Sequence, residues 1–225
     1  MSDSDGAVVQ LTASDGFKLD AFEVSAGATS RGGIVILQEI FGVTDQLKGV
    51  ARSYARQGFD TIVPALFDRA APKTLVPFSE PDRGRQTMHG LDRDKTLLDI
   101  AAAVARLDRG KGVSVIGFCW GGGLALRCAS ELQLNGVAIF YGTALPTLLG
   151  KAPKCPVLFH FGATDPNSPP EVVEAVREAI PSAETHVYEA GHAFANEARS
   201  NVYVKEAAES AHARTLAFLL KAHAN

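Results

Sequence analysis

Short apolar runs alternate with helix-like segments along the whole chain, and this pattern restricts the fold more than any other feature. A continuous apolar run is typical of a strand buried on both faces, and Gly33–Leu37 is such a run. Further largely apolar strands are predicted at Val113–Phe118, Gly136–Phe140 and Val157–Phe161. Apolar residues at helical spacing lie between them. We therefore predict an α/β fold with a single doubly wound, mostly parallel sheet and helices on both faces.

The remaining segments complete this reading of the chain. Further strands are predicted at Phe17–Val24, Asp60–Val63 and Ala183–Tyr188. Helices are predicted from Thr44 or Asp45 to just before Gly58, and over Lys95–Leu107, Gly122–Ala129, Glu171–Ala179 and Lys205–Ala222. Residues 65–94, rich in proline, glycine and charge, are expected to form a long functional loop with one short helix.

Size and composition exclude several classes of protein. The 225 residues suit one α/β domain spanning 1–225, and the net charge of −3 argues against nucleic acid or an anionic membrane as partner. No apolar stretch reaches about 18 residues, and the acidic start is unlike a signal peptide. Three cysteines at unrelated spacings indicate the reduced thiols of a cytoplasmic protein, and without a His/Cys cluster of zinc spacing we expect no metal. We expect no cofactor, and a single domain without an evident exposed apolar stripe is compatible with a monomer.

The segment Gly117–Gly122 follows a predicted buried strand and carries one reactive side chain, Cys119, at its centre. Glycines on both sides allow the strand and the next helix to approach closely around a strained residue. This is the nucleophile-elbow pattern, with cysteine in place of the more usual serine. The alternative for Cys119 is a small buried apolar residue, which is the interpretation we give to Cys128 and Cys155.

Two later loops supply the partners that such a thiol needs. Asp165 follows the strand Val157–Phe161, and His192 follows Ala183–Tyr188, which gives the order nucleophile, acid, histidine of the α/β-hydrolase fold. A neutral imidazole can take the thiol proton, and a carboxylate behind the ring fixes its tautomer. Backbone N–H groups of Trp120 and Ile40 are the expected oxyanion donors.

Glu39 ends a buried strand, where a carboxylate needs a partner or a task. We expect its partner to be an arginine of the long loop, and Arg69 follows the next strand. Arg83 and Arg85 can reach the same place from a flexible segment. The alternative for Glu39 is a structural ion pair without a part in the chemistry.

Five motifs in this order resemble those of the dienelactone hydrolases, or carboxymethylenebutenolidases: Q-E-I-F-G, L-F-x-R, G-F-C-W-G-G, G-x-x-D and G-H-A-F-A. The resemblance runs from about Leu11 to the C-terminal helix. It implies an α/β-hydrolase fold, a triad of Cys119, His192 and Asp165, and a carboxylic ester hydrolase. The implied reaction is attack of the thiolate on a dienelactone carbonyl, expulsion of an enolate, and hydrolysis of the thioester to maleylacetate.

The resemblance also implies roles for other residues. Glu39 would take the thiol proton when substrate arrives, and Arg69 would hold the substrate carboxylate. Well-known members carry a second carboxylate-binding arginine four residues past the histidine, where this chain has Asn196. Arg199 lies nearby in sequence. Phe41 and Phe194 either pack in the core or form the wall of the substrate pocket.

Other functions explain fewer of these residues. A glutamine amidotransferase resembles the cysteine elbow but needs a distal His-x-Glu pair, whereas His192 precedes Ala193–Phe194. The cluster Gly117–Gly123 lacks the spacing of a dinucleotide-binding loop. A hydrolase of other small esters or thioesters and a non-catalytic binding protein on this scaffold remain as alternatives.

Overall fold

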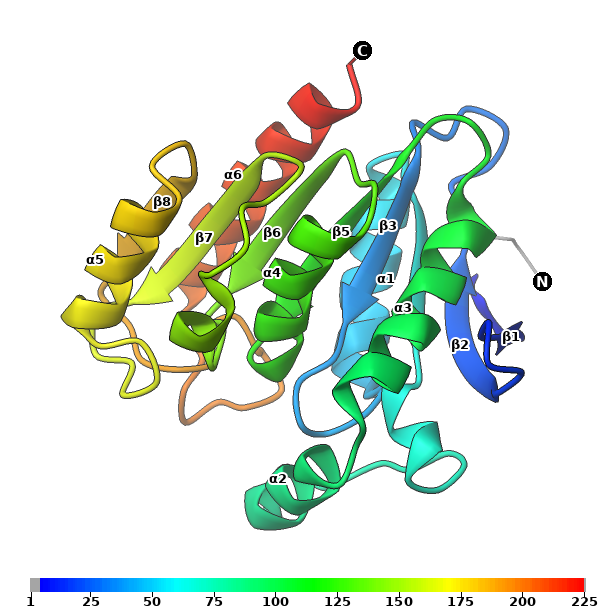
Figure 1. Cartoon of the computed structure of the whole chain (residues 1–225), viewed down its shortest axis with the longest axis horizontal. Coiled ribbons are helices and arrows are strands. Elements are labelled where there is room, and N and C mark those ends of the chain that lie inside the picture. The colour runs from blue at the N-terminus through cyan, green and yellow to red at the C-terminus, as the bar shows by residue number, and fades with distance from the viewer. Residues whose placement is uncertain (1–4, 225) are drawn as a thin grey trace. The chain divides into compact units, whose positions relative to one another are not determined.

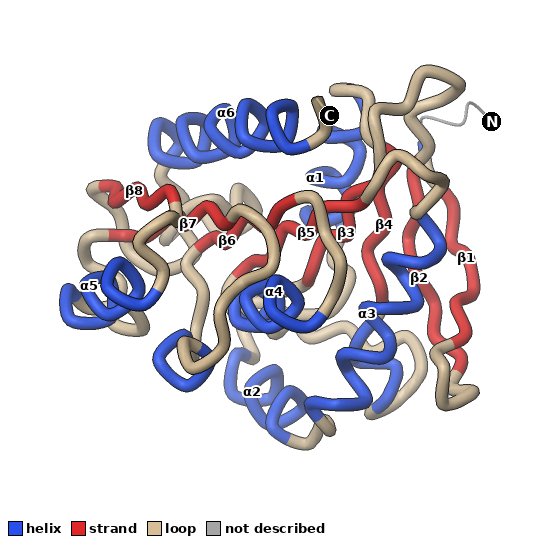
Figure 2. The backbone as a smooth tube through the Cα atoms, turned by 45° about the horizontal axis from the view of Figure 1, so that its top comes forward, coloured by secondary structure: helices blue, strands red, loops and turns tan. Residues whose placement is uncertain are grey.

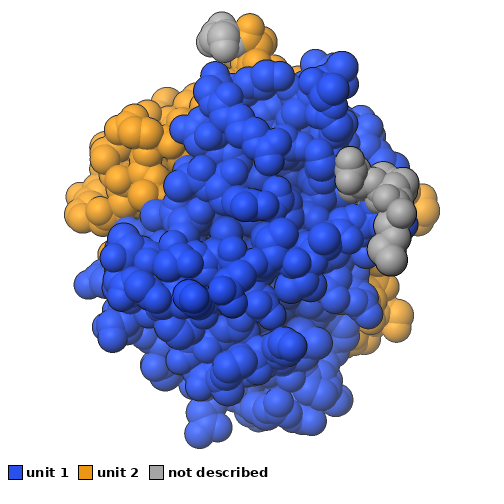
Figure 3. Space-filling view, turned by 90° about the vertical axis from the view of Figure 1, so that its right-hand side faces the viewer, with its two compact units in different colours: residues 1–113 blue, residues 114–225 orange. Residues whose placement is uncertain are grey.

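The computed structural model describes residues 5–224. Its internal contacts divide the chain into two compact units, residues 1–113 and 114–225 (Figure 3). Each unit is described by itself, and the single domain expected over 1–225 stays a prediction.

The first unit holds four strands in the order β1-β2-β4-β3. They are β1 (Ala7–Thr12), β2 (Lys18–Val24), β3 (Gly33–Leu37) and β4 (Asp60–Pro64). β3 and β4 pair in parallel, while β2 runs antiparallel to both β1 and β4. The helices are α1 (Asp45–Arg56), α2 (Pro81–His89) and α3 (Arg93–Leu107), with a short 3-10 helix η2 at Leu66–Arg69. α1 and α3 cover opposite faces of these strands (Figures 1 and 2).

The second unit holds four parallel strands in the order β5-β6-β7-β8. They are β5 (Val113–Phe118), β6 (Gly136–Phe140), β7 (Val157–Gly162) and β8 (Glu184–Tyr188). The helices are α4 (Trp120–Glu131), α5 (Pro170–Ala179) and α6 (Lys205–Ala222), with a short 3-10 helix η3 at Leu145–Leu148. α4 and α5 lie on one face of the strands and α6 on the other (Figure 2). Parallel strands bring their carboxyl ends to the same edge, which is where ligands bind in such sheets.

Local sequence signals account for these elements. α1 begins after Thr44, whose hydroxyl accepts the N–H of Leu47, and its apolar residues face inward at helical spacing. The chain leaves this helix through Gly58, whose φ of +93° suits a residue without a Cβ. The strands β3, β5, β6 and β7 are buried at every position, which explains their largely apolar sequences; the polar exceptions, Ser114 in β5 and His160 in β7, are fully buried.

The α/β class with helices on both faces of a mostly parallel sheet is confirmed, with two differences in detail. β1 has no counterpart in the predicted elements. Residues 65–94, expected as a loop with one short helix, contain η2, α2 and the first turn of α3. Among the described residues, no helix is both long and apolar enough to span a membrane.

Candidate active site

Cys119 sits between β5 and α4, and its backbone is held in a sparsely populated conformation with φ of 55° and ψ of −117°. Its N–H donates to the carbonyl of Phe140 at 3.0 Å, and its own carbonyl accepts the N–H groups of Gly122 and Thr143. A Cβ on Gly117 would overlap the backbone carbonyl of Gly121. The elbow therefore needs glycine where strand and helix backbones touch.

His192 joins the thiol to a carboxylate. Its Nε2 lies 3.1 Å from the Sγ of Cys119, and its Nδ1 lies 2.8 Å from Oδ2 of Asp165. The Asp165 side chain is fully buried, while that of His192 is 20 % exposed. The three side chains follow β5, β7 and β8 at the carboxyl edge, and this arrangement is that of a nucleophile, a base and the group that orients the base.

Asp165 also shapes its own turn. Its Oδ1 accepts both the backbone N–H of Asn167 at 2.8 Å and the side-chain amide of Asn167 at 3.2 Å. The two carboxylate oxygens therefore have different roles: Oδ1 stabilises the loop, and Oδ2 faces His192. A turn-stabilising aspartate and a histidine-orienting aspartate are here the same residue.

The surroundings of His192 change its protonation. Burial lowers the pKa, but hydrogen bonds with Asp165 and Cys119 outweigh burial and raise the pKa to about 10. The environment therefore favours the imidazolium form. A positive ring beside sulfur stabilises negative charge on that sulfur.

An aromatic ring that the sequence did not single out, that of Tyr141, contacts the imidazole. The Tyr141 ring meets His192 edge to face at 5.2 Å between centroids, and Phe194 contacts Tyr141 at 5.3 Å. Tyr141 is fully buried and has a positive φ of 39°, which is strained for a residue with a Cβ. Its position directly after β6, at the same strand edge as Cys119, was the available signal.

In the first unit, the loop Gln38–Gly42 follows β3 and is held by its neighbours. The Gln38 amide is buried, donates to the carbonyl of Glu39 and accepts the N–H of Leu66 at 3.1 Å. Glu39 and Ile40 are both buried, and Glu39 lines a small surface hollow together with Thr44 and its neighbours. Phe41 is 3 % exposed and packs edge to face on another ring, which matches the core-packing alternative for that side chain.

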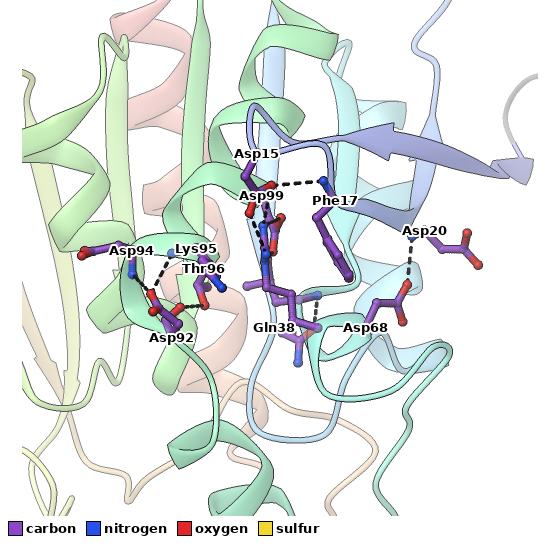
Figure 4. Close-up of polar contacts among 12 residues, drawn as sticks. Asp15, Phe17, Asp20, Gln38, Asp68, Asp92, Asp94, Lys95, Thr96 and Asp99 are labelled. Atoms are coloured by element: carbon purple, nitrogen blue, oxygen red, sulfur yellow. Dashed lines mark hydrogen bonds and ion pairs between the residues drawn. The ribbon is translucent and has the colours of Figure 1, made fainter.

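Arg69 requires a correction. Its guanidinium does not pair with Glu39; it forms a bidentate pair with Asp99 at 2.6 and 2.7 Å and a second pair with Asp15 at 2.9 and 3.2 Å (Figure 4). It also lies over the Phe17 ring, 4.3 Å from the centroid. Hydrogen bonding to Asp99 raises the pKa of Arg69, against the effect of burial. A guanidinium already neutralised by two carboxylates is poorly suited to hold a third.

The other suggested arginines lie at the surface of the first unit. Arg83 pairs with Glu80 and Arg85 with Asp82, each three residues apart in α2 or its cap, and both arginine side chains are about half exposed. Pairs of this kind contribute little to stability. The structure gives neither a partner in the loop after β3.

Asn196 is buried in the loop after β8, with 1 % of its surface exposed, and its Oδ1 accepts the N–H of Ala198 at 3.2 Å. This hydrogen bond stabilises the turn, and a role of Asn196 in substrate binding stays a prediction. Phe194 is fully buried between Tyr141 and Tyr188, as a packing residue would be. Arg199 is partly exposed and closes the same loop through its backbone, since its N–H donates to the Asn196 carbonyl.

Two other histidines and the two other cysteines of the second unit lie in structural settings. His160 is buried between Tyr188 and Thr215, each at 2.9 Å from a ring nitrogen. Burial lowers the pKa of His212 to about 4 and raises that of Cys128 to about 12. Cys155 is partly exposed, and burial raises its pKa to about 11. These groups are poor candidates for proton transfer near neutrality.

Comparison with known proteins identifies relatives over most of the chain. The model of the dienelactone hydrolase family matches residues 19–223. A carboxymethylenebutenolidase of Pseudomonas putida is 33 % identical over 94 % of both chains, and one of Pseudomonas sp. strain P51 is 34 % identical over 85 % of this chain and 86 % of its own.

Solved structures give the same picture of the fold. A candidate dienelactone hydrolase from Klebsiella pneumoniae superposes with a TM-score of 0.80 at 26 % identity, covering 94 % of this chain and 98 % of its own. A dienelactone hydrolase-like promiscuous phosphotriesterase from metagenomic libraries, at 22 % identity and a TM-score of 0.77, covers 96 % of this chain and 98 % of its own and shares the fold. The predicted α/β-hydrolase fold is thereby confirmed.

Proposed function

Because the chain belongs to the dienelactone hydrolase family, we propose that it hydrolyses a small ester or lactone through a thioester on Cys119. The observation that carries this proposal is the bridge made by His192, which reaches the thiol at 3.1 Å and Asp165 at 2.8 Å. The three side chains match the roles of nucleophile, proton carrier and orienting carboxylate.

The proposed reaction has two stages. In the first, the Cys119 thiolate attacks the carbonyl carbon, the carbon–oxygen bond of the ester breaks, and the released alkoxide or enolate takes the proton of the His192 imidazolium. In the second, water attacks the thioester, the now neutral His192 accepts a proton from that water, and the acid leaves with return of the thiolate beside the imidazolium. A protonated His192 facing Cys119 supports the first stage, because the ring stabilises negative sulfur.

The family resemblance supplies further roles, which we propose on that basis. The backbone N–H groups of Trp120 and Ile40 would bind the oxyanion. Trp120 is the first residue of α4, and the positive end of the helix dipole favours negative charge there. Glu39 would take the thiol proton on arrival of substrate.

A cytoplasmic monomer without cofactors likewise stays a prediction, which size-exclusion chromatography and fractionation would test.

Two substrate classes follow from the site. The names of the Pseudomonas relatives suggest a carboxylate-bearing enol-lactone, with dienelactone opened to maleylacetate. The environment of Arg69 favours a second class, neutral small esters, lactones or thioesters. Asn196 adds no charge and is turned into its own loop, which also favours the neutral class.

Turnover by the purified protein tests the proposal. We expect wild type to hydrolyse an activated aryl ester, and Cys119→Ala to abolish hydrolysis of that ester and of dienelactone alike. Unchanged turnover in Cys119→Ala would contradict the thioester route, whereas an absence of turnover by wild type would favour the binding-protein alternative. A thioester trapped by rapid acid quench and located by mass spectrometry would identify the sulfur directly.

A matched pair of substrates separates the two classes. Two esters of equal size, one ending in a carboxylate and one in its methyl ester, are compared by kcat/KM together with cis- and trans-dienelactone. We expect the neutral ester to be the better substrate. A clear preference for the carboxylate would return the assignment to the enol-lactone class.

A further inference from the structure

Ser168 lies three residues beyond Asp165 and links the acid turn to a neighbouring loop. Its N–H donates to the Asp165 carbonyl at 3.1 Å, and its hydroxyl donates to the carbonyl of Gly142 at 3.2 Å. The side chain is 2 % exposed. Pro166 and Pro169 flank this turn, and each fixes its own φ. The turn is thus stiff internally, and the Ser168 hydroxyl attaches it to the segment after β6.

The segment after β6 in turn contacts the nucleophile elbow. The N–H of Thr143 donates to the Cys119 carbonyl at 3.1 Å. A Cβ on Gly122 would lie 2.7 Å from the Cα of Gly142, so the two backbones pack directly against each other. Such contact leaves little freedom for the loop to move relative to the elbow.

Together these contacts form a closed ring through the triad. The ring runs from Cys119 through the loop at Gly142 to Ser168, then through Asp165 and His192 back to the sulfur. Two hydrogen bonds of this ring join the triad itself, those of His192 to Asp165 and to Cys119. The bond from the Ser168 hydroxyl to Gly142 closes the ring at a distance from the reacting atoms.

We propose that Ser168 is a positioning residue that holds the Asp165 turn against the loop after β6, so that the carboxylate stays aligned with His192 and Cys119. The inference rests on the proposed function, because it assumes that the triad performs the hydrolysis. Without the hydroxyl, the turn can pivot, and the distance from Asp165 to His192 is no longer fixed from both sides. Small displacements of catalytic groups have large effects on rate.

The test compares Ser168→Ala with wild type on the aryl ester. We expect kcat to fall about tenfold while KM changes by less than about twofold, because alignment rather than substrate binding is affected. We also expect the alkaline decline of kcat/KM to move to lower pH, since a misaligned Asp165 stabilises the His192 imidazolium less well. A purely structural residue would not move this limb of the pH profile.

A control and a second variant complete the design. Ser130→Ala removes a hydroxyl that also bonds a backbone carbonyl, that of Arg127 at 2.9 Å in α4, and should leave kcat and the pH profile unchanged. Ser168→Cys keeps a nearly equal volume with a weaker donor, so its kcat should lie between wild type and Ser168→Ala. Thermal unfolding of each variant shows whether it is folded. If Ser168→Ala does not fold, the comparison of Ser168→Cys with wild type tests the proposal.

The outcomes are distinct. Equal kinetics for folded variants of Ser168 and Ser130, or a raised KM with unchanged kcat, would overturn the positioning role. Activity that survives in Cys119→Ala would instead overturn the proposed function, independently of the Ser168 results.

Discussion

Replacement of Arg69 by methionine is the sharpest test of how the first unit is held together. Methionine keeps much of the length of the side chain and removes the guanidinium that binds Asp99 and Asp15. These partners lie far apart in the sequence, one in the β1–β2 turn and one on α3 (Figure 4). The substitution therefore releases three elements at once.

The magnitude follows from burial. Asp99 has no exposed surface, and loss of its partner leaves a buried carboxylate alone, which costs about 3–5 kcal/mol. Asp15 lies at the surface, so its pair with Arg69 adds little to stability. Contact with the Phe17 ring adds about 0.5–1 kcal/mol. We therefore expect Arg69→Met to lose about 3.5–6 kcal/mol at neutral pH, with contributions that are not strictly additive.

Urea unfolding measures this loss. Burial raises the pKa of Asp99 even though Arg69 acts to lower it, and removal of Arg69 must raise it further. Protonation then relieves the buried charge, so the difference from wild type should shrink as pH falls through the Asp99 pKa. The double variant Arg69→Met with Asp99→Leu should recover most of the stability.

Two results would refute this reasoning. One is a loss below about 1 kcal/mol in the single variant, which is the range of exposed pairs. The other is a double variant no more stable than the single one. If instead Arg69→Met folds normally and raises KM only for the carboxylate ester, Arg69 is a substrate-binding residue after all.

Three further predictions concern pH and packing. Because the pKa of His192 is raised to about 10, the stability that its protonation contributes is complete below pH 6.5 and is lost as pH rises through 10. The value of kcat/KM should decline over the same alkaline range, and the decline should occur at lower pH in Asp165→Asn. An alkaline decline at the same pH in Asp165→Asn would argue against the His192–Asp165 pair. Burial lowers the pKa of His212 to about 4, so stability should fall as pH drops from about 6.5 toward 4, and His212→Phe should flatten that slope in urea midpoints. Gly122→Ala should lower the melting temperature, because the new Cβ meets backbone at 2.7 Å, whereas Gly49→Ala in α1, with nothing within 4 Å, should raise it; similar melts for both would contradict the close packing of the elbow.

The sequence was sufficient to predict the bounds of an element where its pattern of apolar residues is compatible with only one kind of element. β3, β6 and α6 begin and end at the predicted residues, because strands buried on both faces and a helix with regular apolar spacing have strong patterns. β1 was missed because it is a mostly exposed edge strand, with Val8 66 % exposed, and its apolar residues do not alternate regularly with polar ones. Half-exposed edges carry little periodic signal.

The same limit applies to the candidate site. Cys119, Asp165 and His192 each follow a strand, so their order in the chain fixed their place at one edge, and the structure brings them together. The partners of Arg69 could not be inferred, since Asp99 and Asp15 are 30 and 54 residues away and occupy elements whose packing the sequence does not specify. Tyr141 and Ser168 matter through contacts that only the fold creates.

The inward orientation of Asn196 has a consequence for how specificity can change in such a chain. The side chain has 1 % of its surface exposed, and its oxygen stabilises the turn at Ala198. An arginine introduced here would remove that acceptor and bring a larger, charged group into a filled space. A carboxylate-binding arginine at this position therefore requires two changes: the loop must first adopt another conformation, and only then can the arginine be accommodated. Asn196→Arg alone should lower the melting temperature without lowering KM for the charged member of the ester pair.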